Sequence, residues 1–165
     1  MPTNEPNTIK IREIEPTDRG WVRELFIQNW AGDFMIIRGK AYKLEELSGY
    51  IAELNNKKVG LITFKDTGQE LEITSLNSLL EKKGVGTALV NKVVSLAKTK
   101  KLKNIRLITT NDNLSALRFW QKRGFKLLRI YPDAIEAYHK LKPGIPLIGE
   151  NGIPLRDEIE LEMRL

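Results

Sequence analysis

Residues 70–87 read ELEITSLNSLLEKKGVGT, a strand pattern followed by a glycine turn and the first residues of a helix. Leu71 and Ile73 share one side of this predicted strand, whereas the next apolar residue, Leu76, has the opposite parity. Side chains alternate between the two faces of a strand, so one inserted residue, a β-bulge, would produce this shift. The alternatives are a strand that ends near Thr74 and a strand that is buried on both faces.

The helix predicted after the glycine turn runs to about Lys100, and a strand follows at 105–109. Strand, turn, helix and strand in this order predict a right-handed parallel crossover. Further strands are predicted at 9–14, 50–54, 59–64, 70–78, 125–131 and 157–164, and further helices at 16–30, 113–123 and 134–141. Residues 55–58 read as a hairpin turn, and residues 34–44 are ambiguous between helix and strand.

Length and composition predict one domain over residues 1–165, because a domain typically has about 150 residues. The chain has no cysteine, which excludes disulfides, thiolate zinc sites and cysteine nucleophiles. It has one histidine, His139, so a histidine metal cluster is impossible, and we expect no metal site. No apolar run approaches the roughly 20 residues of a membrane span, and the first residues do not resemble a signal peptide. We therefore expect a cytoplasmic protein.

The glycine turn, Glu81 to Gly86, has the features of an anion site. Glycines let several backbone N–H groups point outward, and the start of a helix adds partial positive charge. Leu89 stands where the dinucleotide fingerprint has its third glycine, and no Gly-Lys-Ser/Thr follows as in a P-loop. The neighbouring cations Lys82, Lys83, Arg118 and Lys122 could attract phosphates as mobile surface groups. A structural turn at the start of a helix is the alternative.

Residues 113–125 read NLSALRFWQKRGF and predict a helix with defined ends. Asn113 is a good N-cap, and Gly124 suits the left-handed position just after a helix. Trp120 and Phe125 fall at the positions that make an apolar contact in this kind of helix ending. A structural role is enough to explain each of these four residues when it is considered singly.

Together, the two segments resemble the GNAT superfamily of acetyl-CoA-dependent N-acyltransferases. The family motifs read here as Glu81-x-x-Gly84-x-Gly86 and Asn113-x-x-Ala116-x-x-Phe119-Trp120-x-x-x-Gly124-Phe125. The order of predicted elements also fits over nearly the whole chain. The resemblance implies an α+β fold, with a mixed, mostly antiparallel sheet, one splayed parallel pair and helices on both faces. It also implies that residues 1–165 form a single N-acetyltransferase domain.

The resemblance further implies acetyl-CoA as the co-substrate. Strands 70–78 and 105–110 would part at the bulge and receive the pantetheine arm, while amides of residues 82–87 would hold the pyrophosphate. A backbone N–H near Leu76 could stabilise the oxyanion, and a Cβ at Gly86 would obstruct the phosphates. The cofactor residues implied are Leu76, Asn77, Ser78, Lys82, Lys83, Gly84, Val85, Gly86, Thr87, Asn113, Ala116 and Phe119.

Two positions depart from the family pattern. Glu81 replaces the usual Gln or Arg, and we expect its carboxylate to point to solvent. Trp120 replaces a tyrosine that in many members protonates the leaving thiolate. A thiol has a pKa near 8.5, so the thiolate leaves without a strong acid, and water or Tyr131 could supply the proton.

The acceptor implied by the resemblance is a small-molecule, protein or peptide amine. Such an amine has a pKa of about 10 and must lose a proton before attack, so a base is needed. Glu72, beside the predicted cleft, is a candidate base, and an exposed strand carboxylate is the alternative. By position in the family, Trp30 and Asp33 are expected to line the acceptor side. His139 is expected on a helix surface.

Two other functions compete with catalysis. The missing tyrosine at position 120 favours a GNAT-shaped module that binds acyl-CoA or a partner with little turnover. The net charge of +6 and the lysines of 98–103 allow a nucleic-acid-binding protein. No aromatic residues interleave these lysines, so base stacking is not supported and nucleic acid is not the expected partner. We expect a monomer or homodimer without a membrane partner.

Overall fold

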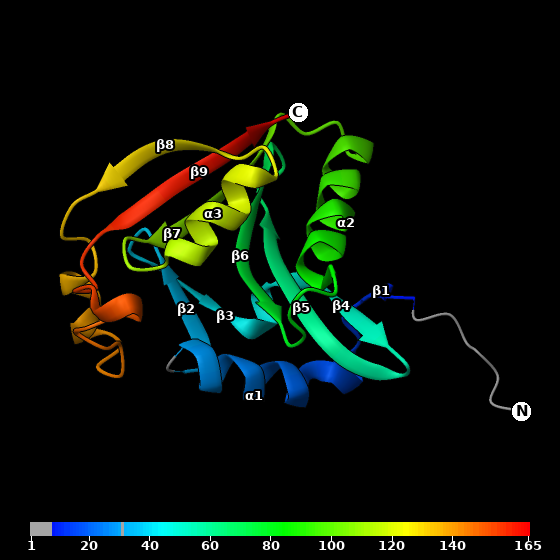
Figure 1. Cartoon of the computed structure of the whole chain (residues 1–165), viewed down its shortest axis with the longest axis horizontal. Coiled ribbons are helices and arrows are strands. Elements are labelled where there is room, and N and C mark those ends of the chain that lie inside the picture. The colour runs from blue at the N-terminus through cyan, green and yellow to red at the C-terminus, as the bar shows by residue number, and fades with distance from the viewer. Residues whose placement is uncertain (1–7, 31) are drawn as a thin grey trace, which may run out of the picture.

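The computed structural model describes residues 8–30 and 32–165 and consists of one seven-stranded sheet, a separate hairpin and three α-helices (Figure 1). In spatial order, the sheet contains β1 (Lys10–Glu13), β4 (Ser48–Leu54), β5 (Lys57–Asp66), β6 (Glu70–Ser78), β7 (Asn104–Thr110), β9 (Glu158–Arg164) and β8 (Lys126–Tyr131). Among the described strands of this sheet, only β6 and β7 pair in parallel. The mostly antiparallel mixed sheet predicted from the sequence is therefore confirmed.

The helices cover both faces of the sheet, as predicted (Figure 1). The α-helices are α1 (Arg19–Trp30), α2 (Val85–Thr99) and α3 (Leu114–Lys122), and short 3-10 helices span Pro16–Asp18, Leu44–Glu46, Glu136–Lys140 and Glu150–Gly152. On β5, Ile62 packs with α2 and α3, whereas its neighbour Leu61 packs with α1. This alternation gives the molecule one apolar core on each side of the sheet.

The ambiguous residues 34–44 form a hairpin of β2 (Phe34–Ile37) and β3 (Lys40–Lys43). Its turn consists of Arg38 and Gly39, whose φ angles are 49° and 75°. Two left-handed residues are typical of the type I′ turn that closes a tight hairpin. The apolar run of β2 lacks an alternating pattern, so periodicity did not distinguish strand from helix there.

Two other predicted boundaries are corrected by the structure. The turn between β4 and β5 contains only Asn55 and Asn56, both left-handed with φ of 50° and 60°. A two-residue turn lets β5 begin at Lys57, so the four-residue turn expected at 55–58 is wrong. The helix expected at 134–141 is only the 3-10 helix Glu136–Lys140.

The bulge predicted in β6 is present. Thr63 of β5 is paired with Ser75 and the next residue, Phe64, with Ile73, so Thr74 is the inserted residue. The Thr63 hydroxyl oxygen lies 2.7 Å from that of Thr74 and 2.5 Å from that of Ser75, and all three side chains are buried. A hydroxyl network therefore holds the bulge against the neighbouring strand.

The parallel strands part as predicted. Pairing between β6 and β7 covers Glu70–Ile73 and Asn104–Leu107, and β6 then continues to Ser78 without pairing to β7 (Figure 1). On its other edge, β7 pairs along its whole length with β9, which lies between β7 and β8. The β7-facing edge of residues 74–78 in β6 therefore has no strand partner in the described part of the chain.

Candidate functional site

Three of the predicted cofactor residues converge from three different elements: Leu76 of β6, Gly86 of α2 and Phe119 of α3. A Cβ built at Gly86 would lie 3.2 Å from two atoms of the Phe119 ring and 3.9 Å from Leu76 Cδ2. The absent side chain of Gly86 therefore makes room for Phe119. This differs from the expected obstruction of phosphates, because the Cβ direction of Gly86 points into the protein.

The other predicted cofactor residues of β6, Asn77 and Ser78, lie within its unpaired segment. Asn77 is half-buried, and its Oδ1 is buried without a hydrogen-bond partner in the described residues. The exposed Ser78 donates from its hydroxyl to the Leu80 carbonyl at 2.8 Å. Asn77 therefore retains an unused acceptor beside the segment where β6 and β7 part.

The glycine turn has two left-handed residues and open space at Gly84. Lys82 and Gly84 are left-handed, with φ of 57° and 74°, and nothing lies within 4 Å of a Cβ built at Gly84. Gly84 is the N-cap of α2, so the N–H groups of Val85, Gly86 and Thr87 belong to the first turn, which has no intrahelical acceptors. Glu81 and both lysines of the turn are exposed. The geometry suits an anion bound by backbone N–H groups.

Arg123 adds a fixed cation that the sequence did not single out. Its Nε and Nη2 donate to Thr87 Oγ1 at 3.0 and 2.5 Å, and its guanidinium carbon lies 3.5 Å from the centroid of the Phe119 ring. Burial lowers the pKa of Arg123, and no carboxylate of the described residues forms an ion pair with it. The spacing of four residues from Phe119 was the available signal, because such residues are neighbours on a helix surface.

The predicted ends of α3 are confirmed. Asn113 Oδ1 accepts a hydrogen bond from the Ala116 N–H at 3.2 Å, and Gly124 is left-handed with φ of 93°. Trp120 is buried between Phe119 and Phe125, with ring centroids 5.0 and 5.1 Å apart and nearly perpendicular planes. Trp120 therefore packs in the core, where it makes edge-to-face contacts with both phenylalanine rings.

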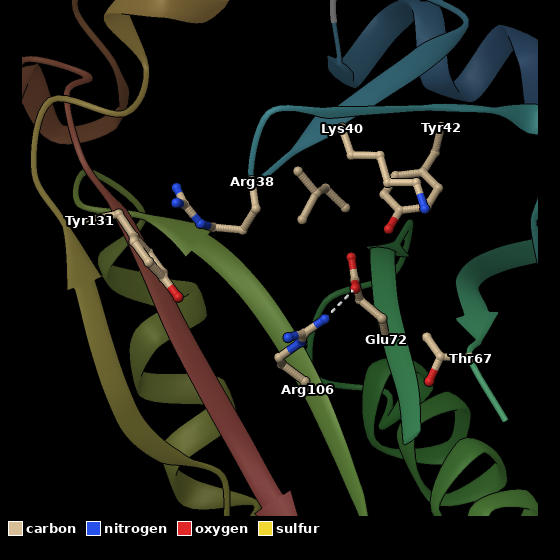
Figure 2. A pocket seen from close by; sticks show the side chains of 8 residues that line it. Arg38, Lys40, Tyr42, Thr67, Glu72, Arg106 and Tyr131 are labelled. Atoms are coloured by element: carbon tan, nitrogen blue, oxygen red, sulfur yellow. Dashed lines mark hydrogen bonds and ion pairs between the residues drawn. The ribbon is translucent and has the colours of Figure 1, made fainter. Parts of the chain in front are cut away.

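A separate pocket of 390 Å³ lies on the sheet face that carries the β2–β3 hairpin (Figure 2). Six of its eight lining residues bear a charge or a phenol: Arg38, Lys40, Tyr42, Glu72, Arg106 and Tyr131. The hairpin contributes the first three, and β6, β7 and β8 contribute the others. Of the predicted site residues, the pocket brings together Glu72 and Tyr131.

Glu72 is a buried carboxylate with one unused oxygen, in contrast to the exposed strand residue that was the alternative. Its Oε2 accepts from Arg106 Nη2 at 2.8 Å, whereas its Oε1 is buried without a hydrogen-bond partner in the described residues. Figure 2 shows the carboxylate pointing into the pocket toward Tyr42. Burial, and then the negative charge of Glu72, raise the pKa of Tyr42.

Tyr131 is held from two sides. Its hydroxyl donates to Glu160 Oε2, and this hydrogen bond raises the pKa of Tyr131. The Arg38 guanidinium carbon lies 3.4 Å from the centroid of the Tyr131 ring (Figure 2). Arg38 Nη1 also donates to Glu158 Oε1 at 2.9 Å. The hairpin turn is thereby attached to β8 and β9.

Tyr138 strengthens this attachment. Its hydroxyl donates to Glu158 Oε1 at 2.6 Å and accepts the Gly39 N–H at 2.8 Å. Burial and the hydrogen bond to Glu158 raise the pKa of Tyr138 to about 12. The pocket wall therefore depends on β9 for its position.

The other predicted residues lie outside this pocket. Trp30 is half-buried against the α1 core with its Nε1 buried and unpaired in the described residues, and Asp33 is exposed. Lys142 Nζ donates to the Phe34 carbonyl near Asp33, and burial lowers the pKa of Lys142. His139 Nε2 lies 2.9 Å from the Ile145 carbonyl oxygen, which gives it a structural contact.

Within residues 8–30 and 32–165, no group of three or more histidine, aspartate or glutamate side chains is arranged to hold a metal ion. No helix of the same residues is long and apolar enough to cross a membrane.

Sequence comparison matches residues 11–125 to the Acetyltransferase (GNAT) family. The chain is 43% identical over 145 residues to the uncharacterized protein YxbD of Bacillus subtilis (strain 168), which covers 87% of this chain and 91% of YxbD. It is 42% identical over 137 residues to YdhI of the same organism, covering 82% and 86% of the two chains.

Solved structures share the fold. The structure of a GNAT family acetyltransferase from Elizabethkingia anophelis with acetyl-CoA bound aligns with a TM-score of 0.72 and 24% identity, over 97% of this chain and all of the other. The IAA acetyltransferase from Bacillus cereus ATCC 14579 aligns with the same score and identity, over 96% of this chain and all of the other. At 24% identity, the similarity to these two structures shows a shared fold.

Proposed function

The chain belongs to the acetyltransferase (GNAT) family, and we propose that it transfers an acetyl group from acetyl-CoA to an amine by direct attack in a ternary complex. The main support for this proposal is that one strand, β6, carries two features of the site. β6 provides the unpaired edge at 74–78 and, four residues before Leu76, the buried Glu72 with its unused Oε1. In this proposal, the unpaired edge of β6 therefore contacts acetyl-CoA, and Glu72 of the same strand contacts the amine. Residues 1–165 would form one N-acetyltransferase domain.

The residues available to hold acetyl-CoA fit its chemistry. The N–H groups at the start of α2 and the cation of Arg123 suit the pyrophosphate, and the free edge of β6 suits the amide groups of pantetheine. Leu76, Ala116 and Phe119 offer apolar surface along the same path, and Asn113 caps the helix beside it. Bound acetyl-CoA in the Elizabethkingia anophelis protein of the same fold supports this assignment.

Acetyl-CoA supplies an activated thioester. In the proposed reaction the neutral amine nitrogen attacks the thioester carbonyl carbon, and the carbon–sulfur bond breaks. Glu72 Oε1 takes the proton that the amine loses, while a backbone N–H near Leu76 stabilises the oxyanion. The thiolate takes its proton from water, because Tyr131 donates to Glu160 and Trp120 is core.

The test is thiol release from acetyl-CoA with a panel of amines. We expect Glu72→Gln to lower kcat by about 10²–10⁴-fold, the usual contribution of a general base, with unchanged acetyl-CoA affinity. The matched control is Glu70→Gln, because Glu70 also pairs with Arg106, at 3.1 Å, but does not line the pocket. Full turnover by Glu72→Gln would remove Glu72 from the mechanism. Tight acetyl-CoA binding without transfer to any amine would favour the binding module instead.

Hydrogen exchange tests the cofactor site separately. Acetyl-CoA should slow exchange at residues 76–78 and 82–87 far more than in the 50–64 hairpin, because the first two segments hold unpaired N–H groups. Uniform protection, or protection confined to residues 98–103, would place the ligand elsewhere.

For the acceptor we propose a small-molecule amine over a protein or peptide amine, because 390 Å³ lies in the range of small-ligand sites. We propose that the protein acts as a monomer or homodimer in the cytoplasm. Acetylation assays and sedimentation of the purified full chain test the acceptor class and the oligomeric state respectively.

A further inference from the structure

Most charges around the 390 Å³ pocket already have partners in the described residues. Arg106 pairs with Glu72 at 2.8 Å and with Glu70 at 3.1 Å, and it lies 3.7 Å from Glu160. Arg38 pairs with Glu158 at 2.9 Å. These ion pairs fix the arginines to the sheet and leave them little capacity to choose a ligand.

Two groups of the pocket wall remain without such a partner. One is Glu72 Oε1, which is buried and has no partner at hydrogen-bond distance in the described residues, although the Tyr42 hydroxyl faces Glu72 and is near enough for that carboxylate to raise the pKa of Tyr42. The other is Lys40 Nζ, which forms no ion pair with a described carboxylate and lies 5.1 Å from the centroid of the Tyr42 ring. Figure 2 shows Lys40 and Tyr42 side by side, with the Tyr42 hydroxyl directed toward Glu72.

Each group requires a particular partner. A buried carboxylate oxygen without a donor is costly, so its partner must be an N–H or O–H group. The exposed ammonium group of Lys40 attracts an anion. Tyr42 separates the two groups, so one small molecule has to present both functions at different ends.

Resting on the proposed function, the geometry points to an acceptor that is a small zwitterion, an amine carrying a carboxylate or similar anion. Its nitrogen hydrogen-bonds to Glu72 Oε1, which aligns it for attack, and its anion pairs with Lys40 Nζ. A diamine would place its second cation beside Lys40 and would be repelled. A neutral monoamine would leave Lys40 without a partner.

The experiment compares amino acids with the amines that lack only the carboxylate. Glycine, β-alanine and 4-aminobutyrate are paired with methylamine, ethylamine and propylamine, and 1,4-diaminobutane provides a doubly cationic probe. In the thiol-release assay we expect kcat/KM to be at least about tenfold higher for the best amino acid than for its partner, the effect of one charge-assisted contact.

Lys40→Met should reduce this preference to within about twofold, mainly by raising KM for the amino acid. The matched control is Lys57→Met, which removes an exposed strand lysine outside the pocket and should leave both rates unchanged. A preference that survives Lys40→Met would overturn the role of Lys40 and the proposal.

Calorimetry separates this proposal from the proposed reaction. The same probes are titrated into the full chain loaded with CoA, which cannot transfer an acetyl group. Selective, Lys40-dependent binding of an amino acid without transfer would support the zwitterion site and refute the reaction. Equal or stronger binding and turnover of simple amines or the diamine would overturn the zwitterion site and leave the reaction standing. Neither binding nor turnover of any probe would overturn both.

Discussion

The hydroxyl of Thr63 lies 2.7 Å from the hydroxyl of Thr74, the residue inserted into β6. The same Thr63 oxygen is 2.5 Å from the Ser75 hydroxyl. Both contacts are buried, so neither hydroxyl of β6 can turn to water instead. The position of the bulge, and with it the point at which β6 leaves β7, is therefore set by a side chain of β5.

Thr63→Val should loosen this arrangement, because valine keeps the shape but leaves the Thr74 and Ser75 hydroxyls without their shared partner. We expect the free energy of unfolding to fall by about 1–3 kcal/mol, the cost of leaving buried polar groups unpaired. Urea titration measures it, and Thr63→Ser, which keeps the hydroxyl, is the control. A loss in Thr63→Ser without a loss in Thr63→Val would mean that the methyl group, and not the hydroxyl, matters.

Gly86→Val should weaken acetyl-CoA binding by displacing Phe119, whose ring lies 3.2 Å from the Cβ position. Overpacking of this kind typically costs about 1–3 kcal/mol, which corresponds to a five- to 150-fold change if it is expressed in affinity. Adding Phe119→Leu should restore part of that loss, because leucine leaves space for the branched side chain. Calorimetry on the four variants of the double-mutant cycle checks the coupling, and purely additive losses would exclude the collision.

Trp120→Ala should lower the free energy of unfolding by about 3–5 kcal/mol, the usual cost of removing a large buried aromatic side chain. Trp120→Tyr should cost much less, because a phenol ring can retain the edge-to-face contacts with Phe119 and Phe125. Denaturant unfolding followed by circular dichroism provides both values. A Trp120→Ala protein as stable as the parent would show that the indole does not hold the core together.

Acid stability should depend on Asp18. Its hydrogen bond to Arg12 holds the pKa of this buried carboxyl well below its usual range, helped by the Glu15 N–H and by Lys58. A depressed folded-state pKa contributes stability that is complete above the unfolded value of about 3.9 and is lost as the pH falls.

Asp18→Asn should therefore lower the free energy of unfolding at pH 7 by about 3 kcal/mol, because the half-buried Arg12 loses one of its two carboxylate partners and keeps only Glu53. The difference from the parent should shrink as the pH falls below about 4. Asp33→Asn, at an exposed position, serves as the control with an unchanged acid limb. A constant difference from pH 7 to pH 2 would contradict the coupling between Asp18 and Arg12.

The features that were predicted correctly from the sequence depend on residues that are close together in the chain. The parity change between Ile73 and Leu76 indicated the bulge, because inserting one residue has a fixed effect on which face each side chain takes. Asn113 and Gly124 marked the ends of α3, since capping groups act within one turn. Combined with the strand order and the resemblance to the GNAT family that they support, these local signals were sufficient for the fold and for the parting of β6 and β7.

The pocket could not be derived in the same way. Arg38 and Glu158 are 120 residues apart in the chain and meet only because β9 joins the sheet beside β7. The apolar run of β2 concealed the hairpin that carries Arg38, Lys40 and Tyr42. The signals that were available were the Arg38-Gly39 pair, typical of a tight turn, and the alternating glutamates of 158–162, which share one face of a strand.

The position of β9 in the sheet also determines when folding of the chain can be completed. β8 precedes β9 in the chain but reaches the sheet only through it. While residues 158–164 are still inside the ribosome, β8 has no neighbouring strand to pair with. Slow, long-range pairing of this kind leaves a nascent chain open to aggregation. The 390 Å³ pocket, which Tyr131 of β8 lines, therefore forms only after β9 has been synthesised and β8 has paired with it.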